Sequence, residues 1–321
     1  MNHIKDQIHC ERAYRMGLSG KGIGVAVLDT GIFLHRDFDS RVTGFADMVN
    51  RRNFAYDDCG HGTHICGIIG GSGRMSGGRY SGIAPGCNLI MVKVLDRKGN
   101  GYSSDVLAGI SWVLERKEQL GIRILNISVG ACSKRGMSEN SALVKGVNRA
   151  WDAGLVVVVA AGNNGPRTMS ITTPGISRKV ITVGCSDDDR EVLVGGNRMV
   201  DYSGRGPTAA CICKPDLVAP GCSVVSCSSR ADKYTIKSGT SMSTPIVSGA
   251  VALLLERFPD MSNKDVKLRL RESSVDIGLP RNQQGWGLLD VGKMLDSKRK
   301  HIEMLLRVCY IVYKEVSPID G

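Results

Sequence analysis

The sequence predicts an α/β fold, a single domain built on a doubly wound, mainly parallel sheet with helices on both faces. Continuous apolar runs bounded by glycine recur along the chain, as expected of strands that are buried on both faces. Segments of helix length separate these runs, which indicates right-handed crossovers between parallel strands. Apolar residues make up 42% and charged residues 23% of the chain, values typical of a globular protein with a large core.

The predicted strands and helices alternate along the first half of the chain. The runs that predict strands are Gly22–Gly31, Leu89–Leu95, Ile122–Ile127, Leu155–Ala161 and Val180–Val183. The segments that predict helices are Gly62–Gly70, Asp105–Leu120 and Glu139–Ala153. Asp29, Ser128 and Asn163 come just after predicted strands. Because doubly wound sheets carry their sites at the carboxyl ends of strands, these residues are candidates for a site.

The second half changes character before it reaches a long apolar helix. Between Asp187 and Ser238 the apolar runs are short and turns are frequent, which predicts short strands and loops. The segment Ile246–Leu255 is apolar on every side, so as a helix it must be buried. Pro245 fits a first helical turn, and Thr240 or Ser241 can cap the helix. Such a serine is either an ordinary cap or a nucleophile beside unpaired backbone N–H groups. A more polar helix is predicted near Asn263–Glu272.

Domain organisation, charge and cysteine content limit the functions open to this chain. Without internal repeats or linkers, the sequence predicts a leader (1–18), one domain (19–290) and a C-terminal tail (291–321) whose residues 297–313 are compatible with an exposed helix. The net charge is +11, but Lys and Arg are scattered and no zinc-finger spacing occurs, so no nucleic-acid partner is expected. The eleven cysteines are irregularly spaced, which predicts reduced thiols rather than a disulfide framework. The sequence shows no signal peptide, so a cytoplasmic location is expected. No apolar run has the length of a membrane span, so no membrane partner is expected.

Three reactive side chains stand where core packing alone would not require them. Asp29 ends a buried strand, where a carboxylate is costly unless turn N–H groups or a partner hold it. His61 opens a predicted helix, whereas His64 fits a hydrogen-bonded structural histidine, since the i, i+4 spacing of helical zinc ligands is absent. A nucleophilic Ser241 needs a base, and the base needs a carboxylate. The three residues Asp29, His61 and Ser241 provide one of each.

The motifs around these residues resemble those of subtilisin-like serine peptidases, the subtilase family, and the resemblance extends over about residues 18–289. They are Asp29–Gly31 (DTG), His61–His64 (HGTH) and Gly239–Pro245 (GTSMSTP), in the Asp…His…Ser order of that family. Because a signal peptide is missing and thiols are many, the chain most resembles the intracellular bacterial members of the family. The resemblance implies a subtilisin-like fold and a serine endopeptidase that acts on protein or peptide substrates.

The resemblance also implies further site residues. Asn163, read from its own surroundings as a turn residue, would donate to the oxyanion together with the Ser241 N–H. The residues implied in substrate binding form four groups: Gly99, Asn100 and Gly101 at a strand edge; Ser128, Val129 and Gly130 at one pocket wall; Ala160, Ala161 and Gly162 in the oxyanion stretch; and Thr172 or Thr173 near the pocket floor. An extended substrate would add as a strand to the sheet edge.

Two segments depart from the family pattern: the one where the family binds calcium, and the stretch between Asn163 and Pro174 at the pocket floor, which is short. The segment Gly71–Arg79, where the family binds calcium, has no carboxylate and two arginines, so neither a metal nor a cofactor is expected. If Met1 is the true start, the chain must fold without the N-terminal pro-domain of secreted subtilases, and Met1–Arg15 would form either an extended strand across the groove or a surface helix.

The alternatives to a peptidase are a peptide-binding pseudoprotease and an esterase with the same triad. The oligomeric state cannot be predicted.

Overall fold

The computed structural model describes residues 1–130 and 139–296, and these residues build a parallel sheet covered by helices on both faces. The sheet has seven strands in the order β2-β3-β1-β4-β5-β6-β9, and neighbouring strands are parallel. The strands of the sheet are β1 (Gly24–Asp29), β2 (Val42–Asp47), β3 (Asn88–Lys93), β4 (Ile122–Ile127), β5 (Val156–Ala160), β6 (Ile181–Cys185) and β9 (Leu217–Ala219). The predicted fold class is therefore confirmed.

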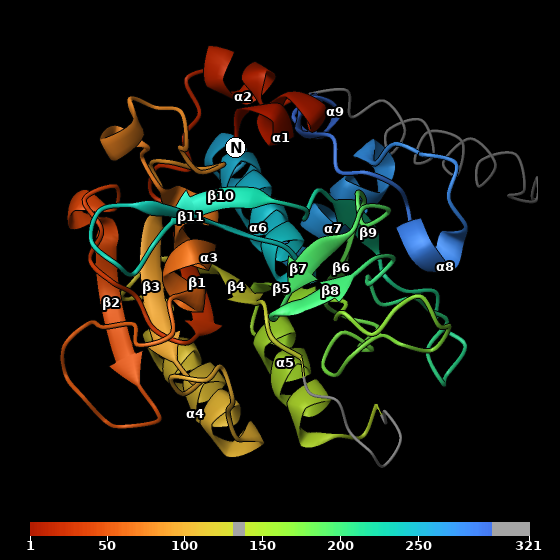
Figure 1. Cartoon of the computed structure of the whole chain (residues 1–321), viewed down its shortest axis with the longest axis horizontal. Helices are drawn as coiled ribbons and strands as arrows, with labels where there is room; N and C mark the ends of the chain where they lie inside the picture. The colour runs from red at the N-terminus through yellow and green to blue at the C-terminus, as the bar shows by residue number, and fades with distance from the viewer. Residues whose placement is uncertain (131–138, 297–321) are drawn as a thin grey trace, which may run out of the picture.

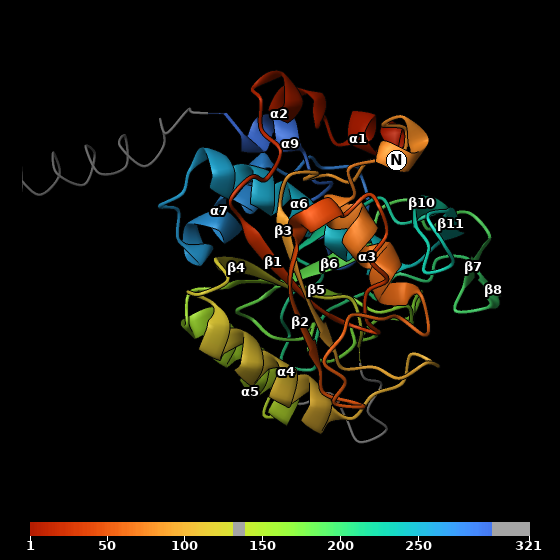
Figure 2. The same ribbon diagram turned by 90° about the vertical axis from the view of Figure 1, so that its left-hand side faces the viewer.

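Helices cover the two faces of the sheet in separate layers, as Figure 2 shows from the side. The described helices are α1 (Asn2–Gln7), α2 (Glu11–Arg15), α3 (His61–Gly70), α4 (Ser103–Arg116), α5 (Ala142–Asp152), α6 (Thr240–Arg257), α7 (Asn263–Ser273), α8 (Arg281–Gln284) and α9 (Val291–Met294), with short 3₁₀ turns at Asp39–Arg41 and Arg74–Ser76. Helices α4 and α5 lie together on one face, and α3 and α6 lie on the other. Among the described helices, none is long and apolar enough to cross a membrane.

Two edge strands were missed by the apolar-run pattern, for different reasons. Strand β2 is mostly half-buried, so it lacks the continuous apolar run of a strand covered on both faces. Strand β9 is fully buried but has only three residues. Short strands are predicted between residues 187 and 238, and the structure has them there: β9, which joins the sheet, and the antiparallel pairs β7 (Val192–Val194) with β8 (Asn197–Met199) and β10 (Val224–Cys227) with β11 (Tyr234–Lys237).

Helix α6 is buried along nearly its whole length, as its apolar sequence predicts, but it begins differently. The helix starts at Thr240, so Pro245 is its sixth residue and lies beyond the first turn, where its ring removes a helical hydrogen bond. The predicted cap is also wrong, because Thr240 and Ser241 both lie within the helix and neither caps it. Gly239 precedes the helix with φ 137°, a conformation that favours glycine.

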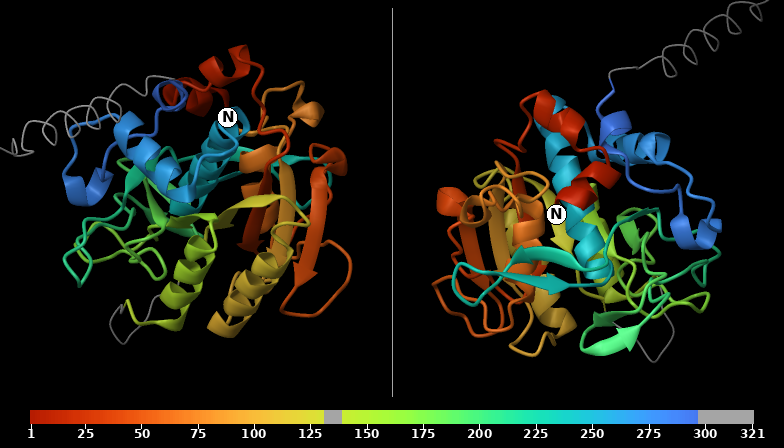
Figure 3. Two further views of the ribbon diagram at one scale, coloured as in Figure 1. Left: turned by 180° about the vertical axis from the view of Figure 1, so that it is seen from behind. Right: turned by 45° about the horizontal axis from the view of Figure 1, so that its top comes forward.

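The segments on either side of the predicted domain pack onto the same core. Residues 2–15 form α1 and α2 rather than an extended strand, and Ile4 and Ile8 are completely buried. At the other end, Val291 and Leu295 are also buried in this core. Figure 3 shows the N-terminal helices beside α9. The predicted helix at 297–313 lies outside the described residues.

Candidate active site

Asp29 and His61 meet at the carboxyl end of β1. The Nδ1 atom of His61 lies 2.7 Å from Oδ1 and 2.9 Å from Oδ2 of Asp29, whose side chain is completely buried. The backbone N–H of Thr30 also donates to Oδ1 of Asp29. Because a carboxylate only accepts, Nδ1 must carry the proton, and the lone pair of the imidazole is then on Nε2. This is the tautomer that a general base requires.

The electrostatics of His61 favour proton uptake. Burial by itself lowers the pKa of this imidazole, but the charge and the hydrogen bond of Asp29 raise it by more. The positive charge of Lys237 opposes that rise. The net pKa of His61 lies above its ordinary value, so an imidazolium that forms during a reaction is stabilised.

Asp57, which the sequence reasoning missed, fixes the start of α3. Its Oδ1 atom accepts hydrogen bonds from the hydroxyl of Thr30 at 2.9 Å and the N–H of Gly60 at 2.8 Å. Its Oδ2 atom accepts from the N–H and the hydroxyl of Thr63, at 2.9 and 2.6 Å. One carboxylate thus joins the loop after Asp29 to the first turn of the His61 helix. A carboxylate just before a helix is a sequence signal for capping and could have identified it.

Lys93, also missed, is a fully buried lysine at the end of β3. Its Nζ donates to the carbonyl oxygens of Thr30 at 2.6 Å and Leu95 at 2.8 Å, and it pairs with Asp58 at 2.7 Å. These bonds hold the loop after β1 against the loop before α3. The position of a lysine at the end of a mostly apolar strand is a sequence signal that could have identified Lys93 as a buried, paired residue.

Ser241 lies in the first turn of α6, and its hydroxyl donates to the carbonyl oxygen of Ser128 at 2.8 Å. Ser128 follows β4 and is buried. In this arrangement the hydroxyl proton is directed at a backbone carbonyl rather than at His61. The hydroxyl must rotate before His61 can accept its proton.

Asn163 lies against the same helix start. Its Oδ1 atom accepts from both the N–H and the hydroxyl of Thr240, each at 3.0 Å. Because a backbone N–H can only donate, the amide oxygen must face Thr240, and this fixes the orientation of the NH₂ group. A Cβ atom added to Gly239 would lie 3.3 Å from that nitrogen. Asn163 therefore caps α6 from another loop and keeps its amide donors beside the helix start.

Several of the predicted pocket residues meet around Thr172. Its side chain fills the space next to Gly130, beyond β4, and Gly162, beyond β5, where an added Cβ would come within 2.2 and 2.4 Å of it. Its N–H donates to the carbonyl of Ala161 at 2.9 Å, which continues from Ala160 at the end of β5. Val129, between Ser128 and Gly130, is half-buried. These residues form one cluster, and their chain neighbours Ser128 and Asn163 contact the start of α6.

The predicted strand-edge residues Gly99, Asn100 and Gly101 are exposed and form part of a turn. Asn100 exchanges hydrogen bonds with Asp96, donating to its carboxylate at 2.9 Å and accepting from its N–H at 2.7 Å. Among the described residues, no hydrogen bond joins this turn to His61 or Ser241, and its substrate role stays a prediction.

His64 is a structural histidine, as its spacing predicts. It is completely buried, and its Nε2 donates to the carbonyl oxygens of Val224 at 3.1 Å and Thr235 at 3.2 Å. Burial lowers its pKa to about 3, so it stays neutral at physiological pH.

Comparison with known proteins identifies the family to which this arrangement belongs. Residues 20–287 match the profile of the Subtilase family. The chain belongs to the subtilase family. It is 42% identical over 285 residues to serine protease AprX of Bacillus subtilis, covering 83% of this chain and 64% of AprX. It is also 32% identical to subtilisin DY of Bacillus licheniformis, covering 88% and 94% of the two chains.

Solved structures agree with the sequence relatives. The fold matches that of sphericase with a TM-score of 0.71 and 31% identity, covering 85% of this chain and 93% of sphericase. A cold-adapted subtilisin-like serine proteinase matches with a TM-score of 0.70 and 29% identity, covering 85% and 90%. This subtilase is therefore a subtilisin-type serine endopeptidase, and the resemblance stated from the sequence is confirmed.

Proposed function

We propose that this subtilase hydrolyses peptide bonds of extended or unfolded polypeptides, with Ser241 as the nucleophile, His61 as general base and Asp29 as its orienting carboxylate. The observation that carries these roles is the buried Asp29–His61 pair, which leaves a basic Nε2 on His61. Helix α3, which begins with His61, packs against α6, whose first turn contains Ser241. We expect Asn163 to stabilise the oxyanion together with the N–H of Ser241.

The contacts of these residues suggest an order of events. The Ser241 hydroxyl leaves the carbonyl of Ser128, and His61 takes its proton as the oxygen attacks the scissile carbonyl carbon. Asp29 stabilises the resulting imidazolium without itself taking the proton. His61 then returns the proton to the leaving amine, and water repeats the same steps on the acyl-enzyme. Throughout, we expect the NH₂ group of Asn163 to donate to the developing negative oxygen.

A serine-directed covalent probe, followed by digestion of a peptide library, tests this function. We expect labelling at Ser241 and cleavage at many sequences, because strand addition reads the main chain. No labelling would favour a pseudoprotease, and labelling with hydrolysis of esters but not peptides would favour an esterase. Cleavage sites read by mass spectrometry would also give the preferred substrate side chains.

The charge of Lys237 provides a pH prediction. The positive charge of Lys237 lowers the pKa of His61, so removing that charge in the Lys237→Met variant should raise the pKa of His61. His61 must be neutral to act as a base, so a higher pKa means that activity is lost at a higher pH on acidification. We expect the acid limb of the kcat/KM profile to move to higher pH. Lys233→Met, on the same hairpin but exposed, is the control and should leave the limb in place. A limb that stays in place or moves to lower pH in Lys237→Met would contradict this role of Lys237.

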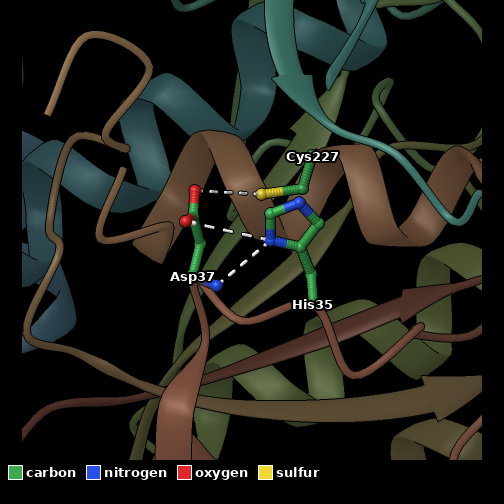
Figure 4. A group of neighbouring side chains, drawn as sticks. All are labelled: His35, Asp37 and Cys227. Carbon is green, nitrogen blue, oxygen red and sulfur yellow. Dashed lines mark hydrogen bonds and ion pairs between the residues drawn. The ribbon is translucent and has the colours of Figure 1, made fainter. Parts of the chain in front are cut away.

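We also propose that the segment Gly71–Arg79 does not bind calcium. The buried carboxylate of Asp37, which contacts this segment, already accepts from the N–H of Met75 at 2.9 Å and the hydroxyl of Tyr234 at 2.7 Å. Figure 4 shows the Asp37 carboxylate facing both His35 and Cys227. Arg74 pairs with Asp39 at 3.2 Å, which places a cation where a calcium site needs oxygens.

Chelation should therefore leave the stability of this subtilase unchanged. We expect the Tm of the Ser241→Ala variant, which cannot digest itself, to be the same with and without EGTA. A ligand that binds only the folded state raises its stability, so a fall in Tm of many degrees would show that calcium does bind.

We propose a reducing compartment, the cytoplasm, as the location of this subtilase. Every cysteine in the described part of the chain is a free thiol, and Cys66 and Cys87 are completely buried. Alkylation of whole cells before lysis should find these thiols reduced and the protein in the cell extract. Recovery of the protein mainly from the medium would argue against this location.

A further inference from the structure

A cluster of metal-ligating side chains lies beyond the carboxyl ends of β6 and β9, outside the proposed catalytic residues. Cys185 is the last residue of β6, Asp187 follows two residues later, and Cys222 lies in the loop after β9. One ligand atom from each, the two sulfurs and a carboxylate oxygen, lie within 4.8 Å of one another. Both cysteines are buried, whereas Asp187 is half-buried and gives the cluster a side towards solvent.

Polar contacts distinguish these cysteines from thiols that only fill apolar space. The hydroxyl of Tyr202, which is completely buried, lies 3.2 Å from the Cys185 sulfur and 3.1 Å from the Cys222 sulfur. Cys185 also donates to Oδ1 of Asp187 at 3.1 Å, and Cys222 donates to the Asp187 carbonyl oxygen at 2.6 Å. A buried cysteine usually packs as a small hydrophobe, but here two sulfurs and three oxygens converge.

We propose that Cys185, Asp187 and Cys222 bind a zinc ion, with the Tyr202 hydroxyl oxygen as the fourth ligand. Zinc prefers tetrahedral sites of sulfur, nitrogen and carboxylate ligands. Two sulfurs bound to one tetrahedral zinc are about 3.8 Å apart, given zinc–sulfur bonds of about 2.3 Å, so only small movements are needed. On binding, Zn²⁺ replaces the thiol protons of Cys185 and Cys222, which pass to solvent, while Asp187 already carries a carboxylate.

The second cluster of this kind in the described residues, His35, Asp37 and Cys227, is a poorer candidate and provides a control (Figure 4). It has one sulfur, and all three side chains are completely buried. The Nε2 atom of His35 donates to the Lys233 carbonyl at 3.1 Å, and its Nδ1 atom accepts from the Asp37 N–H at 3.1 Å. A metal ion would have to break these bonds.

The position of the proposed zinc site connects it to the nucleophile helix. Oδ1 of Asp187 accepts from the N–H of Gly221 at 2.7 Å, and the carbonyl of Gly221 accepts from the N–H of Gly239, just before α6, at 3.0 Å. Bound zinc would therefore brace the loop that supports the start of α6. Its occupancy should raise the Tm of the protein.

Zinc binding is best measured in a background without the exposed thiols, which would compete for the metal. The exposed Cys211 and Cys213, and Cys132 and Cys309 outside the described residues, are replaced by serine, and Ser241→Ala prevents self-digestion. Under reducing conditions we expect one zinc ion per chain, a rise in Tm with zinc, and a tetrahedral cobalt spectrum with sulfur-to-cobalt charge transfer when cobalt replaces zinc.

Further substitutions in this background assign the ligands. Cys185→Ser and Cys222→Ser should each weaken zinc binding by at least about tenfold, and Cys227→Ser should leave it unchanged. Asp187→Asn and Tyr202→Phe preserve side-chain shape and should weaken binding too, so the test survives if a serine variant fails to fold. The proposal is overturned if the reduced background binds no zinc, if Cys185→Ser binds it as tightly as the background, or if the two cysteines form a disulfide and the reduced form retains no metal.

Discussion

The Ser241→Ala variant is expected to lose about six orders of magnitude in kcat while keeping its fold, the size of loss known for the same change in subtilisin. The alanine lacks the hydroxyl that His61 would deprotonate, so no acyl-enzyme forms. Among the described residues, the hydroxyl makes one hydrogen bond, to the Ser128 carbonyl, so the stability cost of losing it should be about 1 kcal/mol.

Peptide hydrolysis by the purified variant, together with its circular dichroism and Tm, checks this expectation. Ser243→Ala is a matched control. Ser243 lies two residues after Ser241 on the same helix, and its hydroxyl also donates to a backbone carbonyl, that of Pro220, at 3.2 Å. The control should remain active. A Ser241→Ala variant that cleaves peptides at a tenth of the wild-type rate would mean that another residue is the nucleophile.

The second large effect is expected for Asn163→Ala, with kcat lowered by roughly 10²–10³ and KM little changed, the range found when subtilisin loses one oxyanion donor. The amide would bind the oxyanion and not the ground-state carbonyl, so its loss should appear in kcat. The variant also loses the acceptor for the Thr240 N–H, a capping bond whose loss costs about 1 kcal/mol.

Asn163→Asp separates the two roles of this side chain. Aspartate keeps an oxygen acceptor for Thr240 but has no NH₂ donor, so the helix cap should survive and kcat should still fall. Steady-state kinetics and Tm measurements on both variants distinguish the effects. A change mainly in KM would make Asn163 a residue that binds the substrate in its ground state.

The fold could be predicted largely because parallel strands buried on both faces have an unbroken apolar sequence. The same rule could not find β2, which is half-buried at an edge, or β9, which is too short. The start of α6 was misjudged because its cap is not local: the acceptor for the Thr240 N–H is Asn163, which is 77 residues away in the chain.

The sequence likewise identifies only some residues of the candidate site. Asp29, His61 and Ser241 stand in long motifs that indicate their chemistry in the sequence. The residues that hold them in place, such as Asp57 and Lys93, act through contacts between separate loops, and Lys93 reaches Asp58 across 35 residues. Such pairings depend on the order of strands in the sheet, which a single sequence does not specify.

The bond between Ser241 and the Ser128 carbonyl ties the resting nucleophile to an acceptor in the loop after β4. A peptide whose N–H donates to this carbonyl would release the hydroxyl towards His61 as it binds, whereas a small ester without an N–H would not. A neutral hydrogen bond contributes about 0.5–1.5 kcal/mol, which corresponds to roughly two- to tenfold in reactivity. If a bound peptide displaces the hydroxyl in this way, the arrangement would act as a mild filter that favours peptides over other acyl compounds.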